Sequence, residues 1–196
     1  MVLEQRVYTL EEFERIAEAP ENADRLLELI NGEIVEKVPT EKHGMIAGNM
    51  FGPLWNFVQQ HKSGRIVMEV RYRSPDDQRN ARIPDIAFSS ARRPVVERGS
   101  VPEMPDLAVE VKSPDDTVKE LREKARYFLM NGTRMVWLVY PGKRIIEVYT
   151  PDNEYILDET DTLSGGDVLP GFTLPVRDVF IDPIAEDTSM PEQAQE

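Results

Sequence analysis

The sequence contains no cysteine among its 196 residues. Disulfides, thiolate nucleophiles and cysteine-based zinc sites are therefore excluded, and the absence fits a reducing cytoplasm, where we expect the protein to work. Long hydrophobic runs are also missing: a run such as residues 135–140 (MVWLVY) is far shorter than the about 20 residues that span a bilayer. The N-terminal segment shows no basic start followed by an apolar stretch, so we expect no signal peptide.

Net positive charge is missing as well, because 36 acidic side chains outnumber 23 basic ones and give a formal net charge of −13. A charge of that sign argues at first against a nucleic-acid partner. The distribution is uneven, however, since residues 61–100 carry 9 basic and 5 acidic side chains, and most of the basic ones are arginine. This segment is compatible either with a local anion-binding surface or with an ordinary solvated surface.

Hydrophobic residues make up 40% of the chain, which is typical of a folded globular protein. A chain of this length can bury one sizeable core. We therefore expect one domain over residues 1–181. Residues 182–196 are acidic and contain almost no large apolar side chains, so they predict a disordered tail.

The order of the predicted elements indicates a mixed-sheet α/β (α+β) domain. Helices are expected over residues 8–19, 42–64 and 113–132. Strands are expected within residues 25–38, 64–74, 106–113, 134–150 and 154–159, and residues 76–90 are expected to pass from a loop into a strand. Residues 168–180 are expected to form a short strand or a cover segment.

Local signals predict where several of these elements begin, turn or end. Thr9, with a glutamate three residues later, predicts a capping box at the first helix. Asn31-Gly32 predicts the tight turn of a hairpin. Gly64 is the expected end of the second helix and Ser113 the expected N-cap of the third.

The strand predicted over residues 106–113 carries charges that a buried strand usually avoids. Because side chains alternate between the faces of a strand, the apolar residues of this segment face one way and Glu110 and Lys112 the other, about 7 Å apart along the strand. An unpaired buried charge is very costly, so the charged face must open onto a cleft or find partners. A simple ion pair at a sheet edge is the alternative interpretation.

A second carboxylate lies upstream, at Asp85. Pro84 disfavours a helix there, which places Asp85 at or near the start of a strand. If this strand pairs with the strand of Glu110, the two carboxylates can converge on one hard divalent cation such as Mg²⁺. Such a cation lowers the pKa of bound water and neutralises charge on a phosphoryl group, and Lys112 would orient the water or stabilise the transition state. The constellation indicates phosphodiester hydrolysis.

Pro84-Asp85 followed by Glu110-Val111-Lys112 resembles the PD-(D/E)xK nuclease signature. Longer stretches resemble one branch of that superfamily, the Uma-two family of restriction endonucleases. These stretches are LINGE at residues 29–33, EKHG at 41–44, PDLAVEVKSPDD at 105–116, the helix and strand at 123–139, and LPGFTLPV at 169–176. The resemblance covers roughly residues 8–180, which is almost the whole predicted domain.

The resemblance implies a restriction-endonuclease-like mixed β-sheet core flanked by helices. It also implies a divalent-metal-dependent endonuclease that acts on DNA, with a homodimer as the expected assembly. Carried over to this chain, Asp85, Glu110 and the Val111 carbonyl would be the ligands of Mg²⁺ or Mn²⁺, and Lys112 would be the catalytic lysine.

Three further residues are secondary candidates. Glu33, in the hairpin, would reach the metal directly or through water, and His43, at a helix start, would contact phosphate or water. Lys124 would project from its helix into the same cleft. Each of the three can also be interpreted as an ordinary surface or helix residue. Two other functions also stay open: a non-catalytic dimeric interaction or nucleic-acid-binding module that keeps the nuclease scaffold, and an enzyme that acts on RNA or small phosphodiesters.

Overall fold

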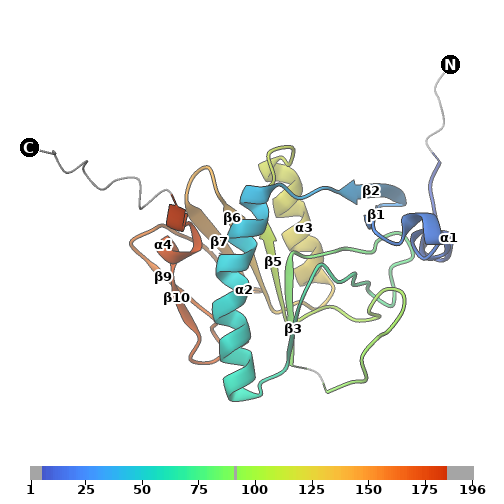
Figure 1. Ribbon diagram of the computed structural model, residues 1–196. Helices are drawn as coiled ribbons and strands as arrows, with labels where there is room; N and C mark the ends of the chain where they lie inside the picture. The colour runs from blue at the N-terminus through green and yellow to red at the C-terminus, as the bar shows by residue number, and fades with distance from the viewer. Residues whose placement is uncertain (1–5, 91, 185–196) are drawn as a thin grey trace, which may run out of the picture.

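The computed structural model describes residues 6–90 and 92–184, and its central feature is a mixed six-stranded sheet (Figure 1). The strand order is β3-β4-β5-β6-β7-β8, in which β5 and β6 are parallel and all other neighbours are antiparallel. The strands are β3 (Arg65–Met68), β4 (Ile86–Ser89), β5 (Leu107–Val111), β6 (Met135–Tyr140), β7 (Ile145–Tyr149) and β8 (Glu154–Leu157). The predicted mixed α/β class is confirmed.

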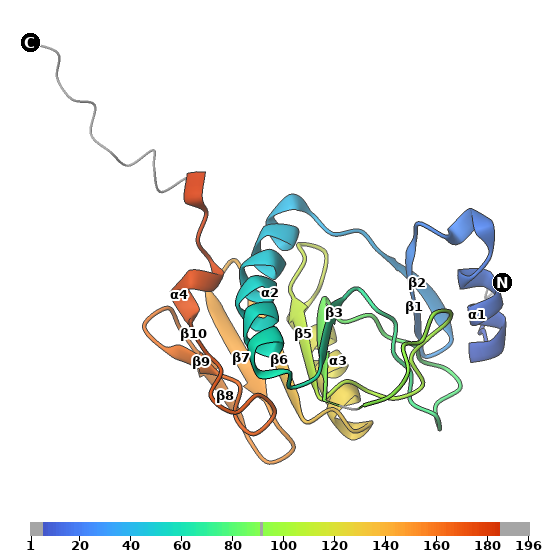
Figure 2. The ribbon, with the colours of Figure 1, turned by 60° about the horizontal axis from the view of Figure 1, so that its bottom comes forward.

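Two helices cover opposite faces of this sheet, α2 (Glu41–His61) in front and α3 (Val118–Met130) behind (Figures 1 and 2). The alternation of β5 explains both layers. Val109 belongs to the apolar core under α2, which also includes Met50 and Leu54. Ala108 faces the other way, into the core under α3. Because α3 connects the parallel strands β5 and β6, it lies across the face onto which the even-numbered residues of β5 project.

A smaller unit precedes the sheet and lies beside it in Figures 1 and 2. It consists of α1 (Leu10–Ala17), the short 3-10 helix η1 (Pro20–Asn22) and the hairpin of β1 (Leu26–Ile30) and β2 (Glu33–Lys37). Thr9 and Glu12 form the predicted capping box of α1. Asn31 and Gly32 have φ of 51° and 88°, the left-handed values that the predicted two-residue hairpin turn requires.

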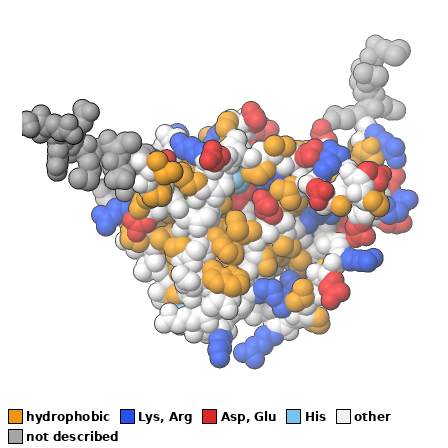
Figure 3. Space-filling view, in the orientation of Figure 1, with side chains coloured by type: hydrophobic (Ala, Val, Ile, Leu, Met, Phe, Trp, Pro, Cys, Tyr) orange, Lys and Arg blue, Asp and Glu red, His pale blue; other side chains and the backbone are white. Residues whose placement is uncertain are grey.

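The C-terminal elements extend the core under α2. They are the antiparallel pair β9 (Thr162–Ser164) and β10 (Thr173–Pro175), followed by α4 (Val176–Val179). The predicted tail begins at residue 182, and its part from residue 185 onwards lies outside the described residues. Figure 3 shows hydrophobic side chains over the middle of the face that carries α2, where Trp55 is 44% exposed. No helix in the described ranges is long and apolar enough to cross a bilayer.

Three of the predicted boundaries are wrong. The N-cap of α3 is Thr117 and not Ser113, because residues 113–116 form a turn of their own and Thr117 makes a capping box with Glu120. The left-handed residue that ends α2 is Lys62, with φ of 48°, and not Gly64. The strand predicted over residues 64–74 ends at Met68, since the next residue has a positive φ that an extended strand does not accommodate.

Candidate active site

Two adjacent strands bring Asp85 and Glu110 together. β4 and β5 pair with Ile86 opposite Val109, so Asp85 and Glu110 are the next residues in the register. Asp85 is 2% exposed and Glu110 is 5% exposed. The Asp85 N–H donates to the Val109 carbonyl over 3.0 Å, and Asp85 Oδ2 accepts from the Val111 N–H over 2.6 Å. The backbone of β5 therefore fixes the position of the Asp85 carboxylate.

One ammonium group, that of Lys37, contacts both carboxylates. Its Nζ lies 2.7 Å from Asp85 Oδ1 and 3.7 Å from Glu110 Oε2. The same Nζ donates to the Ile83 carbonyl over 3.0 Å. Three oxygens from the segment 83–110 thus converge on one cation, which comes from the end of the β1–β2 hairpin.

A second ammonium group, that of Lys124, reaches Glu110 from α3. Its Nζ lies 2.8 Å from Glu110 Oε1 and 3.0 Å from Glu28 Oε1, and it donates to the Ile83 carbonyl over 3.1 Å. Lys124 is three residues after the buried Leu121, so it lies on the face of α3 that contacts the sheet. This position explains why its side chain is only 12% exposed.

Glu28 enters the site because of the alternation of β1. Leu27 and Leu29 point towards α1, so Glu28 points to the opposite face of the hairpin. The register of β1 and β2 places Lys37 on the same face as Glu28. Glu28 Oε1 also accepts from the Ile83 N–H over 2.6 Å. We call Glu28, Lys37, Asp85, Glu110 and Lys124 the carboxylate–lysine cluster.

His43 borders this cluster from the first turn of α2. Its backbone N–H donates to the N-cap Thr40, and its Nε2 lies 3.0 Å from Asp85 Oδ2. Burial acts to lower the pKa of His43, but the hydrogen bond with Asp85 and the charge of that carboxylate raise it on balance. His43 therefore contacts Asp85 Oδ2, while Lys37 contacts Oδ1 of the same carboxylate.

The cluster holds its carboxylates in unequal electrostatic environments. Burial acts to raise the pKa of Asp85, but Lys37 and His43 hold it well below its usual range. Burial also raises the pKa of Glu110 to about 7, and there the charges of Lys124 and Lys37 oppose the shift without cancelling it. Glu110 Oε1 is a buried oxygen that accepts no well-aligned hydrogen bond from the described residues, although Lys124 Nζ lies close to it.

Four of the predicted site residues lie together: Asp85, Glu110, His43 and Lys124. Glu33 does not lie with them. It shares a face of β2 with Lys37 but stands four residues before it, which is about 13 Å along a strand. Its side chain is exposed at the turn end of the hairpin, whereas Lys37 ends the strand beside the cluster.

Lys112 also lies outside the cluster. Lys112 follows Glu110 by two residues in the sequence, but β5 ends at Val111 and the chain then turns towards α3. Lys112 Nζ donates to the Ser113 carbonyl over 2.9 Å, and no ion pair joins it to Asp85 or Glu110 within the described part of the chain. Lys112 lines an adjacent pocket instead.

Sequence reasoning missed Glu28 and Lys37. A signal for Glu28 was present, since it is a charged residue in the middle of the apolar run LLELI. Lys37 offered no such signal, because it is a lysine at the end of a polar strand. Only the packing of the hairpin against the loop that contains Ile83 places Lys37 beside Asp85.

The fit of a divalent cation to these residues is partial. Among residues 6–90 and 92–184, no group of three or more His, Asp or Glu side chains is arranged to hold a metal ion. Mg²⁺, however, commonly uses one or two carboxylates and takes its other ligands from water and substrate phosphate. Asp85 and Glu110 already share one cation, Lys37 Nζ, and Glu110 Oε1 accepts no well-aligned hydrogen bond from the described residues, although Lys124 Nζ lies 2.8 Å away. The two carboxylates therefore fit a divalent cation once Lys37 moves aside.

Comparisons with known proteins identify the same fold and family. The model of a family described as "Uma2: Putative restriction endonuclease" matches residues 10–177. A solved structure of "a putative nuclease belonging to DUF820" from Anabaena variabilis ATCC 29413 is similar with a TM-score of 0.74 and 25% sequence identity, over 88% of this chain and 97% of that chain. No curated protein matches the chain. The predicted family and the predicted nuclease-like fold are confirmed.

Proposed function

This chain belongs to the Uma2 family, and we propose that it is a divalent-metal-dependent endonuclease that hydrolyses phosphodiester bonds in DNA. The observation that carries the proposal is the convergence of Asp85, immediately before β4, and Glu110, in the adjacent strand β5, on a single cation at 2.7 and 3.7 Å. Two buried carboxylates arranged around one positive charge are suited to hold a divalent cation and the water that attacks phosphorus.

Asp85, Glu110 and the Val111 carbonyl are the proposed ligands of Mg²⁺ or Mn²⁺. When bound, the metal supplies Lewis-acid activation of water and of the phosphoryl oxygen. The charge balance of the cluster supports this assignment, because three carboxylates face two ammonium groups. The pKa of about 7 at Glu110 indicates that the positive charge around this carboxylate is insufficient for its burial.

Lys124 is the lysine that we propose for the catalytic role first predicted for Lys112. Its Nζ holds Glu110 Oε1 at 2.8 Å and is anchored by Glu28 and the Ile83 carbonyl. A buried ammonium group fixed in this way can stabilise negative charge that develops on the phosphoryl group without reorganising. His43 acts as a positioning residue, because it holds the Oδ2 of Asp85.

A non-catalytic interaction module, with a homodimer as its assembly, is the second candidate. The observation that favours it is the internal pairing of the cluster, since Asp85 and Glu110 already have lysine partners within 4 Å. Buried ion pairs of this kind can serve structure alone. The two candidate functions differ in one property, because only the endonuclease requires metal binding that depends on Asp85.

The test is a cleavage assay on supercoiled plasmid, single-stranded DNA and an RNA of the same sequence, each with Mg²⁺, Mn²⁺ or EDTA. We expect cleavage of DNA with metal and none with EDTA. Asp85→Asn and Glu110→Gln are expected to lower the rate by at least about a hundredfold. Asp76→Asn is the matched control, because Asp76 is an exposed carboxylate in the loop before β4.

Four outcomes would contradict the proposal in whole or in part. Cleavage by Asp85→Asn at the wild-type rate would show that Asp85 is not part of the active site. Cleavage in EDTA would show that the reaction does not require a divalent metal. Absence of cleavage by the wild type, together with absence of Mn²⁺ binding in calorimetry, would favour the non-catalytic module. Faster cleavage of RNA than of DNA would change the substrate and keep the site.

A further inference from the structure

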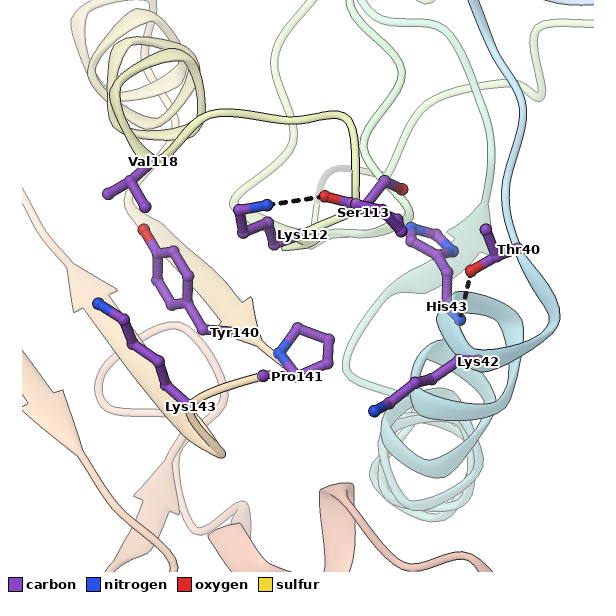
Figure 4. A pocket seen from close by; sticks show the side chains of 11 residues that line it. Thr40, Lys42, His43, Lys112, Ser113, Val118, Tyr140, Pro141 and Lys143 are labelled. Atoms are coloured by element: carbon purple, nitrogen blue, oxygen red, sulfur yellow. Dashed lines mark hydrogen bonds between the residues drawn. The ribbon is translucent and has the colours of Figure 1, made fainter.

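A cavity of about 370 Å³ opens beside the carboxylate–lysine cluster (Figure 4). Its walls come from three separate parts of the chain: the first turn of α2, the segment between β5 and α3, and the turn between β6 and β7. His43 belongs to both places, because it lines the cavity while its Nε2 contacts Asp85. A ligand in this cavity would therefore lie next to the proposed catalytic carboxylates.

Three lysines line the cavity, one from each of these parts: Lys42, Lys112 and Lys143. Among the described residues, the lysines that form ion pairs are Lys37, Lys119 and Lys124. The three lysines of the cavity therefore have no carboxylate partner among these residues. Lys112 only donates to the Ser113 carbonyl (Figure 4). In a chain with a net charge of −13, three unpaired cations at one cavity favour an anionic ligand.

Part of the remaining wall is apolar. Val118 and Tyr140 lie together on one side, and Pro141 lies across from Lys112 (Figure 4). The Tyr140 hydroxyl donates to Glu147 over 2.9 Å, so its ring is held in place as part of the floor. A ligand that fits both surfaces has an anionic group and a flat or apolar group within the volume of one small molecule. A nucleotide has that combination.

We propose that this cavity binds one nucleotide of the substrate strand, with its phosphate beside Lys112 and its sugar and base against Val118 and Pro141, while Lys42 and Lys143, on other sides of the cavity, add long-range positive charge (Figure 4). This inference rests on the proposed function, since the neighbouring phosphodiester would be the one that reaches Asp85. A volume of about 370 Å³ is of the size of one nucleotide. The substrate class is therefore DNA with an unpaired nucleotide beside the cut, and duplex must release a base before it is bound there.

The first test measures binding of a fluorescent single-stranded oligonucleotide in EDTA, where the proposed cleavage does not occur. Lys112→Gln and Lys143→Gln are expected to weaken binding by about three- to tenfold each and to reduce the slope of log affinity against log salt by about 0.7 per lysine. Lys62→Gln is the matched control, because Lys62 lies at the far end of α2 from Lys42. The control should bind as the wild type does, and the single strand should bind more tightly than its duplex.

The second test asks whether the base is held as well as the phosphate. Thymidine monophosphate should displace the oligonucleotide at a concentration about tenfold lower than inorganic phosphate does, because it adds apolar contact. Val118→Ser should reduce that ratio. Pro141→Ala provides the same test in a turn residue if Val118→Ser does not fold. Equal displacement by the two ligands would overturn the nucleotide assignment.

The failures of the two proposals are distinguishable. Lysine variants that bind like Lys62→Gln, or a wild type that does not bind the oligonucleotide, would overturn the cavity as a nucleotide site. Mn²⁺ binding and Asp85-dependent cleavage would then still be present. Loss of both of these in the wild type would instead overturn the endonuclease. Tighter binding of duplex than of single strand would overturn the unpaired-nucleotide class.

Discussion

Replacement of Lys37 by methionine should increase the affinity of the protein for a divalent cation. Lys37 Nζ lies 2.7 Å from Asp85 Oδ1 and 3.7 Å from Glu110 Oε2, and its side chain is 21% exposed. A cation that binds these two carboxylates must displace this ammonium group. Methionine keeps most of the volume of the side chain and removes the competing charge.

The size of the affinity change follows from the burial of Lys37 and its two carboxylate partners, because the strength of an ion pair depends on its exposure to solvent. Exposed ion pairs contribute about 0–1 kcal/mol and removal of one partner of a buried pair costs about 3–5 kcal/mol. The partly exposed Lys37 lies between these limits, at about 2 kcal/mol, which corresponds to roughly a thirtyfold change in affinity. The same change should destabilise the metal-free protein by a similar amount, because Asp85 and Glu110 lose a counter-charge.

Titration calorimetry with Mn²⁺ measures the affinity, and thermal unfolding with Mn²⁺ or EDTA measures the stabilisation by metal. Lys37→Met should bind Mn²⁺ more tightly than the wild type and show a larger gap between its two melting temperatures. Lys119→Met is the matched control, since Lys119 is an exposed lysine of α3 that forms an ion pair with Glu123 on the same helix. An affinity of Lys37→Met equal to or weaker than that of the wild type would refute the reasoning and would indicate that Lys37 supports the metal site.

Three further substitutions test other parts of the structure. Lys124→Met should lower the free energy of unfolding in urea by about 3–5 kcal/mol, because it leaves Glu110 with one counter-charge fewer in the core; a loss under 1 kcal/mol would argue against a buried pair. Burial acts to raise the pKa of Glu147, but hydrogen bonds from Arg122 and two tyrosines lower it on balance. The stability lost in Glu147→Gln should therefore be largest above about pH 4.3 and should vanish as the pH falls through the lowered pKa. Thermal unfolding at several pH values measures this loss, and a loss that grows towards acid pH would contradict the direction of the pKa shift. Gly32→Ala should cost about 1–3 kcal/mol, since Gly32 has φ of 88° and a Cβ there would meet Val7; unchanged denaturant unfolding would contradict the strained turn.

Local sequence signals were sufficient where a short segment determines its own structure. The Thr9 capping box and the Asn31-Gly32 turn form as predicted, because each depends on residues within one turn of the chain. The prediction that Asp85 and Glu110 come together also holds, since alternation sets the face of β5 and the sheet pairs β4 with it. Ser113 was predicted as the N-cap of α3, but Thr117 takes that place because two capping signals compete within five residues.

The sequence by itself determined the class of fold, the family and the two carboxylates, because these depend on periodicity and on short motifs. Only the tertiary structure decided which cations meet those carboxylates. Lys112 is two residues from Glu110 and lies in the cavity, whereas Lys37 is 73 residues from Glu110 and contacts it. The physical reason is that β5 ends at Val111 and the chain turns towards α3, which carries Lys112 away from the carboxylates. A packed hairpin and a helix, in contrast, place the distant side chains of Lys37 and Lys124 at contact distance.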